Sequence, residues 1–193
     1  MAIRLEQMHP SVVHVPITML PLAVGADLVA CLTGNRSLHS FARKAIVVAA
    51  AGAVASAVTG LIAGEEVNVE GDARDMLMTH RNMNFVATVV ASCLALRRSR
   101  RDRPSALYLT VGAVGVGIVA YTAYLGGKIV YETGAGVAPA QGVYRDDAPR
   151  LQSGQVGEFL EDAATDLVHG VQHMVEEVAQ GKLVPTIVAS FTK

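Results

Sequence analysis

The chain has 193 residues, of which 51% are hydrophobic, and its 16 basic and 17 acidic side chains leave a formal net charge of −1. The hydrophobic residues are gathered into long segments, which is typical of an integral membrane protein and not of a soluble domain. The sequence contains no Ser/His/Asp or Cys/His nucleophile pattern, no phosphate-binding glycine loop and no haem-attachment pair of cysteines. This argues against hydrolytic and nucleotide chemistry.

Four apolar segments, each about 20 residues long, follow one another along the chain. They cover residues 12–33, 45–64, 77–96 and 105–125. A helix of about 20 residues spans a hydrocarbon core about 30 Å thick. The first segment contains Pro16, Pro21 and Asp27 and lacks a small-residue cleavage site, so we expect a span and not a signal peptide. The sequence predicts an all-α integral membrane four-helix bundle.

The charged residues predict the orientation of the four spans. The loops after the first and third spans are basic, with Arg36, Arg43 and Lys44 in one and Arg97, Arg98, Arg100, Arg101 and Arg103 in the other. The loop after the second span, residues 65–76, is acidic. By the positive-inside rule we expect the basic loops in the cytoplasm, and the acidic loop with both termini outside. The rule explains the basic loops without any nucleic-acid partner.

Two histidines begin alternate spans: His14 opens the first and His80 the third. Odd-numbered spans run in the same direction, so both imidazoles should lie at similar depth near the outer face. An ionisable side chain at membrane depth predicts a functional site, and two facing histidines in a four-helix bundle can hold a haem or a metal. A structural role for His14 stays open. For His9, which precedes the span, we favour an interfacial or capping position.

Small residues line two of the spans. A stripe that repeats every four positions along the second span consists of Gly52, Ser56, Gly60 and Gly64. It indicates close helix packing, which we favour, or a flat slot for a porphyrin ring. At the end of the fourth span, Gly126 and Gly127 would let the chain pass close to a ligand, so they are candidate walls of the site.

Two acidic residues after the second span, Glu65 and Glu66, are close enough in sequence to approach His80. A carboxylate that accepts the second imidazole proton fixes the tautomer of a ligating histidine. Alternatively, the two glutamates join His14 and His80 as ligands of a non-haem ion such as Zn, Cu or Fe. The residues leave both possibilities open.

Asp27 lies deep in the first span, nearer its cytoplasmic end. An unpaired charge there would be expensive, so we favour a structural pair over a proton-relay role. The candidate partners are basic residues of the flanking loops, namely Arg43, Lys44 and Arg97. Cys31 and Cys93 each lie inside an apolar run, where a buried thiol packs as a small hydrophobe, and we expect no disulfide.

The composition changes after residue 137, so residues 1–137 are predicted to form the transmembrane bundle. Residues 138–154 are rich in Pro, Gly, Asp and Arg and predict an external linker. Residues 155–193 predict an extramembrane tail whose amphipathic helix lies on the bundle, the membrane surface or a partner. His169 and His173 are one turn apart in this helix but lack the pattern of a zincin, so we expect exposed or packing residues.

Several different short motifs are distributed along the predicted bundle. They are His9-Pro10 with Val13-His14-Val15-Pro16, then Gly64-Glu65-Glu66, then His80 before an Asn, and finally Leu125-Gly126-Gly127-Lys128-Ile129-Val130-Tyr131 with Gly134 and Gly136. Together they resemble a bacterial family of four-span membrane proteins carried as a domain of unknown function, over residues 8–137. Val15 stands where many relatives have Phe. The resemblance implies a multi-pass protein of the bacterial inner membrane, and the fusion of some relatives to Rieske iron–sulfur domains implies redox company.

The leading hypothesis is a membrane electron-transfer subunit, similar to a small b-type cytochrome, in which His14 and His80 hold one haem b near the outer face. Its expected walls are the glycines of the second and fourth spans, Gly60, Gly64, Gly126 and Gly127. The alternative is a non-catalytic subunit or a Zn-, Cu- or Fe-binding protein within a larger membrane complex. The expected partners are the lipid bilayer and a redox protein or complex on the periplasmic side. A transporter is disfavoured because Asp27 is the only deep ionisable residue and no span is visibly broken.

Overall fold

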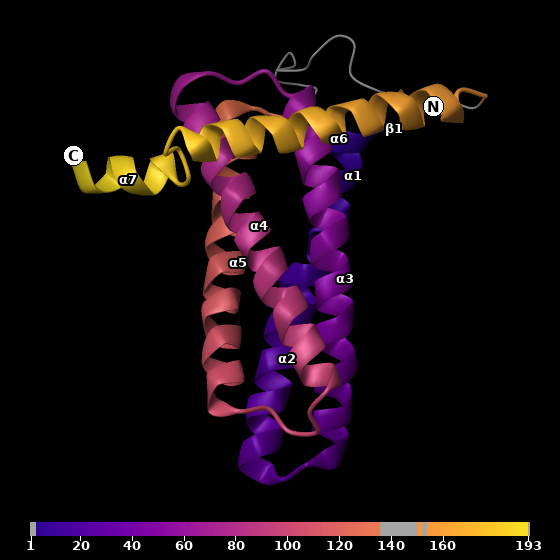
Figure 1. Ribbon diagram of the computed structural model, residues 1–193, viewed down its shortest axis with the longest axis vertical. Helices are drawn as coiled ribbons and strands as arrows, with labels where there is room; N and C mark the ends of the chain where they lie inside the picture. The colour runs from indigo at the N-terminus through magenta and orange to yellow at the C-terminus, as the bar shows by residue number, and fades with distance from the viewer. Residues whose placement is uncertain (1–2, 136–149, 152–153, 193) are drawn as a thin grey trace. The chain divides into compact units, whose positions relative to one another are not determined.

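The computed structural model describes residues 3–135, 150–151 and 154–192. The helices are α1 (Leu5–Val12), α2 (His14–Thr33), α3 (Arg36–Glu66), α4 (Gly71–Ser99), α5 (Ala106–Thr133), α6 (Val156–Ala179) and α7 (Pro185–Thr192). Two short strands, β1 (Ile3–Arg4) and β2 (Arg150–Leu151), pair antiparallel. The predicted all-α class is confirmed (Figure 1). Most of the predicted linker, residues 138–154, lies outside the described residues.

The helices extend further than the predicted spans, because segments that we expected to be loops are helical. Gly34 ends α2 in the left-handed conformation, with φ of 70°, and its N–H donates to the carbonyl of Ala30. The Asn35 side chain then accepts hydrogen bonds from the backbone N–H groups of Ser37 and Leu38, so it caps the start of α3. The basic stretch from residue 36 to 44 therefore forms the first turns of α3 and not a loop.

Among the residues that the structure describes, three segments are long and apolar enough to cross a membrane: Met8–Thr33, Arg36–Glu66 and Ala106–Thr133. Helix α4 has 29 residues and is long enough, but charged residues occupy both of its ends. Its apolar stretch, residues 77–96, is the third predicted span and stays a prediction. At about 1.5 Å per residue, this stretch of 20 residues would extend about 30 Å.

The described chain divides into two compact units, and α3, α4 and α5 each contribute to both. Unit 2 comprises Val12–Ser56 and Asn84–Ala123. Its core is built largely from alanines and branched aliphatic residues, including Leu20, Ala23, Ile46, Ala49, Ala91 and Leu94. A Cβ atom added at Gly52 of α3 would lie 2.5 Å from Val15 of α2, and one at Gly112 of α5 would lie 2.8 Å from Val24. In this unit the small residues serve close helix packing, as favoured from the sequence.

Unit 1 comprises Met1–Ser11, Ala57–Met83 and Tyr124–Lys193. Here the amphipathic tail helix α6 packs against α3, through a cluster of Ile62, Phe159 and Ala163. A Cβ atom at Gly170 would lie 3.0 Å from the Leu61 carbonyl oxygen, so the two helix backbones approach closely. Of the three positions predicted for this helix, the structure therefore supports packing on the bundle helices of its own unit (Figure 1).

The two cysteines are free, but both are exposed on the protein surface. The prediction that they are buried packing residues is wrong.

Candidate functional site

His9, in α1, packs directly on α3 within unit 1. Its Nδ1 atom lies 3.1 Å from the Thr59 hydroxyl oxygen. A Cβ atom at Gly60 would lie 2.8 Å from the imidazole Cε1 atom, so the glycine is what allows the ring to approach the helix backbone. From the sequence we expected His9 to be an interfacial or capping residue, and we did not predict this contact. The available signal was the pair Thr59-Gly60 on the second span. Thr59 can form a hydrogen bond, and the glycine that follows it has no side chain to keep a ring away from the helix.

His80, in α4, is placed in a similar way in the same unit. A Cβ atom at Gly126 of α5 would lie 3.0 Å from the His80 Cε1 atom and 3.6 Å from Nδ1. Gly60 and Gly126, two of the four predicted walls, therefore each lie against an imidazole ring. At Gly64 and Gly127, by contrast, an added Cβ atom would have no neighbouring atom of the described residues within 4 Å, so both glycines face open space.

His14, the other predicted ligand, opens α2 and belongs to unit 2, where it is exposed. The histidine that shares a unit with His80 near the predicted position is His9. The pairing of His14 with His80 stays a prediction.

Glu65 and Glu66 lie in the last turn of α3 and not in a loop. The Glu65 carboxylate approaches the tail, with its Oε2 atom 2.9 Å from Nδ1 of His173 in α6. Glu66 is fully buried. Across the described residues, no group of three or more His, Cys, Asp or Glu side chains is arranged to hold a metal ion. The geometry thus gives no support to the non-haem metal alternative.

Glu177 of α6 is a buried acidic residue that the sequence did not single out. Its carboxylate pairs with Arg74 at 3.0 Å and also with Arg81, both in α4. Next to this pair, the Asn82 side chain donates to the carbonyl of Leu183 at 2.8 Å. These contacts bind the tail to α4 by charge-assisted hydrogen bonds, which are stronger than neutral ones.

Asp27 is the centre of a buried ionic network in unit 2. Arg98, from α4, donates two parallel hydrogen bonds to its carboxylate, at 2.8 Å from Nε and 2.9 Å from Nη2. His39, from α3, lies 3.2 Å from the same carboxylate. The side chains of Asp27 and Arg98 are both 0% exposed. The prediction that Asp27 has a basic partner is confirmed, and its role in this arrangement is to hold three helices together.

The partner of Asp27 is not among the predicted residues. Arg43 pairs instead with Asp102 at 3.3 Å, and Arg97 reaches the Ser105 hydroxyl at 3.4 Å. Consecutive residues point about 100° apart on a helix, so Arg98 faces α2 while Arg97 turns away from it. Arg98 also donates to the carbonyls of Arg101, Asp102 and His39, at 2.6, 3.1 and 3.2 Å, which satisfies the rest of its guanidinium group.

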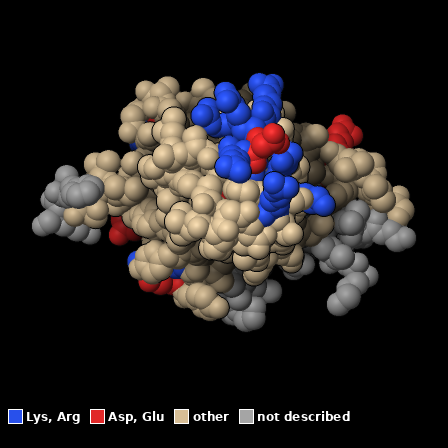
Figure 2. Space-filling model, turned by 90° about the horizontal axis from the view of Figure 1, so that it is seen from below, with Lys and Arg blue, Asp and Glu red and all other residues tan. Residues whose placement is uncertain are grey.

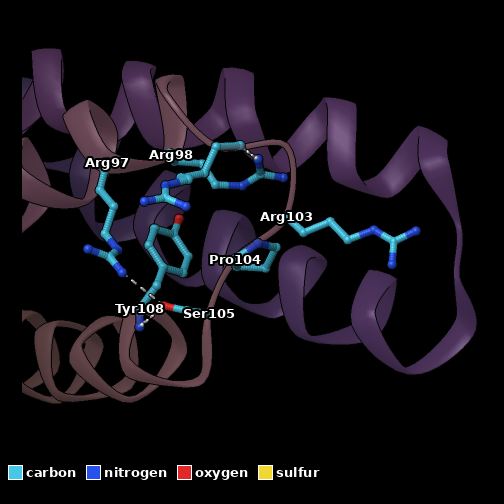
Figure 3. Close-up of a pocket in the computed structure, with 7 residues that line it drawn as sticks. Arg97, Arg98, Arg103, Pro104, Ser105 and Tyr108 are labelled. Carbon is cyan, nitrogen blue, oxygen red and sulfur yellow. Dashed lines mark hydrogen bonds between the residues drawn. The ribbon is translucent and has the colours of Figure 1, made fainter.

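Two pockets flank this network, at an end of the unit where Lys and Arg side chains gather (Figure 2). The first, of about 140 Å³, is lined by Arg97, Arg98, Arg101, Arg103, Pro104, Ser105 and Tyr108 (Figure 3). The second, of about 370 Å³, is lined by residues of α2, α3 and the α4–α5 loop, among them Cys31, Arg36, His39, Arg43 and Asp102. The sequence explained these arginines by membrane topology alone and did not predict a pocket.

Comparison with known families adds a decisive observation to the long apolar helices. A family model described as "Predicted membrane protein (DUF2231)" matches residues 6–139. The chain belongs to the DUF2231 family. The resemblance drawn from the motifs, to a membrane family of unknown function, is thereby confirmed. No curated protein and no solved structure matches the chain.

The DUF2231 match ends six residues after the last residue of α5, so α6 and α7 lie beyond it. Both candidate histidines of unit 1, His9 and His80, fall inside the match, as do Asp27 and Arg98. The tail contacts made by Glu177 and His173 join a segment outside the family region to helices within it.

Proposed function

We propose that this DUF2231 protein crosses the bacterial inner membrane four times, with α4 as the third span and both termini on the periplasmic side. Three long apolar helices support membrane insertion. The orientation follows from charge: the first turns of α3 and the α4–α5 connection are basic, whereas residues 65–76 contain five acidic residues and one arginine. The buried pairing of Asp27 with Arg98 also supports a place for α4 beside α2 within the bundle.

We further propose that the protein is an electron-transfer subunit that binds one haem b near the outer ends of its spans. His80 and a histidine at the start of the chain would hold the haem. The single observation that carries this proposal is the matched setting of His9 and His80 in one unit, each ring packed on a helix glycine. The missing side chain lets each imidazole ring lie directly on a helix backbone, which fixes the orientation of the ring.

The residues of unit 1 suit haem better than a bare ion. Two imidazoles are enough to hold a haem iron, whereas a protein metal site draws on three or four side chains. The Thr59 hydroxyl beside Nδ1 of His9 is a group that fixes the orientation and the tautomer of the ring. When bound, the haem would supply reversible one-electron transfer. The chain's own part is to orient the rings and to exclude water around them.

The second ligand is therefore assigned to His9, and His14, the ligand expected from the sequence, is its competitor. His9 is part-buried and shares unit 1 with His80, whereas His14 is exposed in unit 2. The two are five residues apart at the start of the same candidate span, Met8–Thr33, so a substitution can separate them.

A second candidate function is that of a non-catalytic subunit of a larger complex. The specific observation in its favour is that ionisable side chains of unit 1 bind the tail: Glu177 pairs with two arginines of α4, and Glu65 with His173. In this case the histidines pack helices together and bind no cofactor.

The test is a visible spectrum of the full chain, purified in detergent from cells supplied with haem precursor, with elemental analysis of the same sample. We expect a Soret band that shifts and sharpens on reduction. His80→Ala and His9→Ala should abolish it, while His169→Ala and His173→Ala should leave it unchanged. Loss in His14→Ala but not in His9→Ala would reassign the second ligand. A folded protein with neither haem nor metal would overturn the redox proposal in favour of the non-catalytic subunit.

A further inference from the structure

The smaller pocket of unit 2 concentrates positive charge in a small space. Four of the seven residues that line its volume of about 140 Å³ are arginines: Arg97, Arg98, Arg101 and Arg103. A single water needs about 10–15 Å³ of such volume, so a larger polar group fits. Arginine presents planar, permanently charged donors that match the oxygens of phosphate.

Most of this charge is not neutralised within the pocket. The charge of Arg98 is neutralised by Asp27, with which it forms a buried bidentate pair. Asp102, the one acidic residue of the α4–α5 connection, pairs with Arg43 outside the pocket lining. The remaining guanidinium groups, those of Arg97, Arg101 and Arg103, are exposed and give the pocket a net charge suited to an anion.

The pocket also lies at the beginning of α5, which adds a second source of positive potential. Ser105 caps this helix, since its hydroxyl oxygen accepts the backbone N–H of Tyr108 at 3.2 Å. The first N–H groups of a helix have no intrahelical partner, and together with the helix dipole they favour a bound anion. The Ser105 hydroxyl and the Arg97 guanidinium lie side by side here (Figure 3).

Tyr108 supplies an independent observation that points to a polar ligand. Its side chain is 2% exposed and lines the pocket, with the hydroxyl directed to the side of Arg98 (Figure 3). The hydroxyl lies near the Asp27 carboxylate, but within the described part of the chain no atom meets its oxygen in hydrogen-bonding geometry. Buried polar groups are nearly always satisfied by protein, water or a ligand, so an oxygen acceptor in the pocket would complete this donor.

We propose that this pocket is a binding site for a phosphate group, held by Arg97, Arg101 and Arg103 with Ser105 and Tyr108. The group comes from the headgroup of an anionic phospholipid or from free phosphate. Basic pockets between helices at a membrane face have the charge and position to take lipid headgroups. The site lies in unit 2, so it does not depend on the haem proposal for unit 1.

The experiment measures thermal unfolding of the full chain in detergent as phosphatidylglycerol, phosphatidylcholine or inorganic phosphate is added. Phosphatidylglycerol should raise the midpoint in a saturable way that weakens at high salt. Arg101→Gln and Arg97→Gln should each reduce the apparent affinity at least about tenfold, because each removes a charge-assisted contact to the phosphate. Tyr108→Phe, which keeps the ring, should weaken binding less.

Arg100→Gln is the matched control, because this exposed arginine belongs to the same basic stretch but does not line the pocket. It should bind as the native chain does. Stabilisation by inorganic phosphate as well as phosphatidylglycerol would identify free phosphate as a sufficient ligand, and stabilisation by the lipid alone would identify the headgroup. Equal stabilisation by phosphatidylcholine, an equal loss in Arg100→Gln, or no stabilisation by either phosphate source would overturn the site.

Discussion

Asp27 and Arg98 are 71 residues apart in the sequence, yet their side chains meet in a bidentate ion pair that is wholly shielded from solvent. An arginine guanidinium is permanently charged, so the buried carboxylate of Asp27 has a lasting counter-ion. A buried pair of this kind contributes little net stability compared with apolar residues of similar shape, but it penalises any arrangement that separates the charges. It therefore fixes how α2 and α4 fit together.

The first prediction follows from the difference between removing one charge of this pair and removing both. Arg98→Gln should destabilise the protein by about 3–5 kcal/mol, because it leaves the Asp27 carboxylate buried without its counter-ion. The double variant Asp27→Leu with Arg98→Met should recover most of the loss, since it removes both charges. Thermal or denaturant unfolding in detergent gives the values. Arg43→Gln, which breaks an exposed pair with Asp102, is the control and should cost less than about 1 kcal/mol. A cost for Arg98→Gln as small as that of the control would contradict the role assigned to the buried pair.

The second prediction concerns the attachment of the tail helix. Glu177→Gln removes the charge that binds Arg74 and Arg81, and it should loosen α6 by about 1–3 kcal/mol. Limited proteolysis should then cleave the tail faster while the rest of the chain stays intact. The neighbouring Glu176 is exposed, so Glu176→Gln is the matched control and should leave the cleavage rate unchanged. Equal rates for the two variants would mean that apolar packing alone holds the tail.

The features that could be predicted from the sequence are those that depend on residues close together in the chain, and the features that could not be predicted depend on residues far apart. The helices were predictable because a run of apolar residues is a local signal, and the need of Asp27 for a basic partner followed from the cost of a buried charge. The choice of Arg98 over Arg97 was not predictable, because it depends on the rotation of α4 about its axis. The role of His9 depended on its contact with Thr59 and Gly60, fifty residues away, which no local pattern encodes.

The third prediction tests the glycines beside the histidine rings. Gly60→Leu should cost about 1–3 kcal/mol, because the new side chain would have to displace the His9 ring that now lies on the backbone. Gly64→Leu, one turn further along the same helix, has open space around it and is the matched control. It should be neutral, or stabilising by up to about 1 kcal/mol through better helix propensity. If both substitutions have the same effect on the unfolding midpoint, the close contact of His9 with Gly60 is not a feature of the folded protein.

The last prediction concerns orientation, on which the outer position of the histidines and the inner position of the arginine pocket both depend. In a chain with Cys31 and Cys93 replaced by serine, a single cysteine at Asp72 should react with a membrane-impermeant maleimide in intact cells, and one at Arg100 should react only after the cells are opened. The expectation rests on the excess of arginine at the α4–α5 connection and of acidic residues before and within the start of α4. Both native cysteines must be removed because both are exposed on the protein surface and would add background labelling.

Labelling of both positions on the same side would mean that α4 does not cross the membrane and that the chain has three spans. Labelling at Arg100 but not at Asp72 in intact cells would reverse the topology and place the arginine pocket outside, where the phosphate of an inner-leaflet lipid could not reach it.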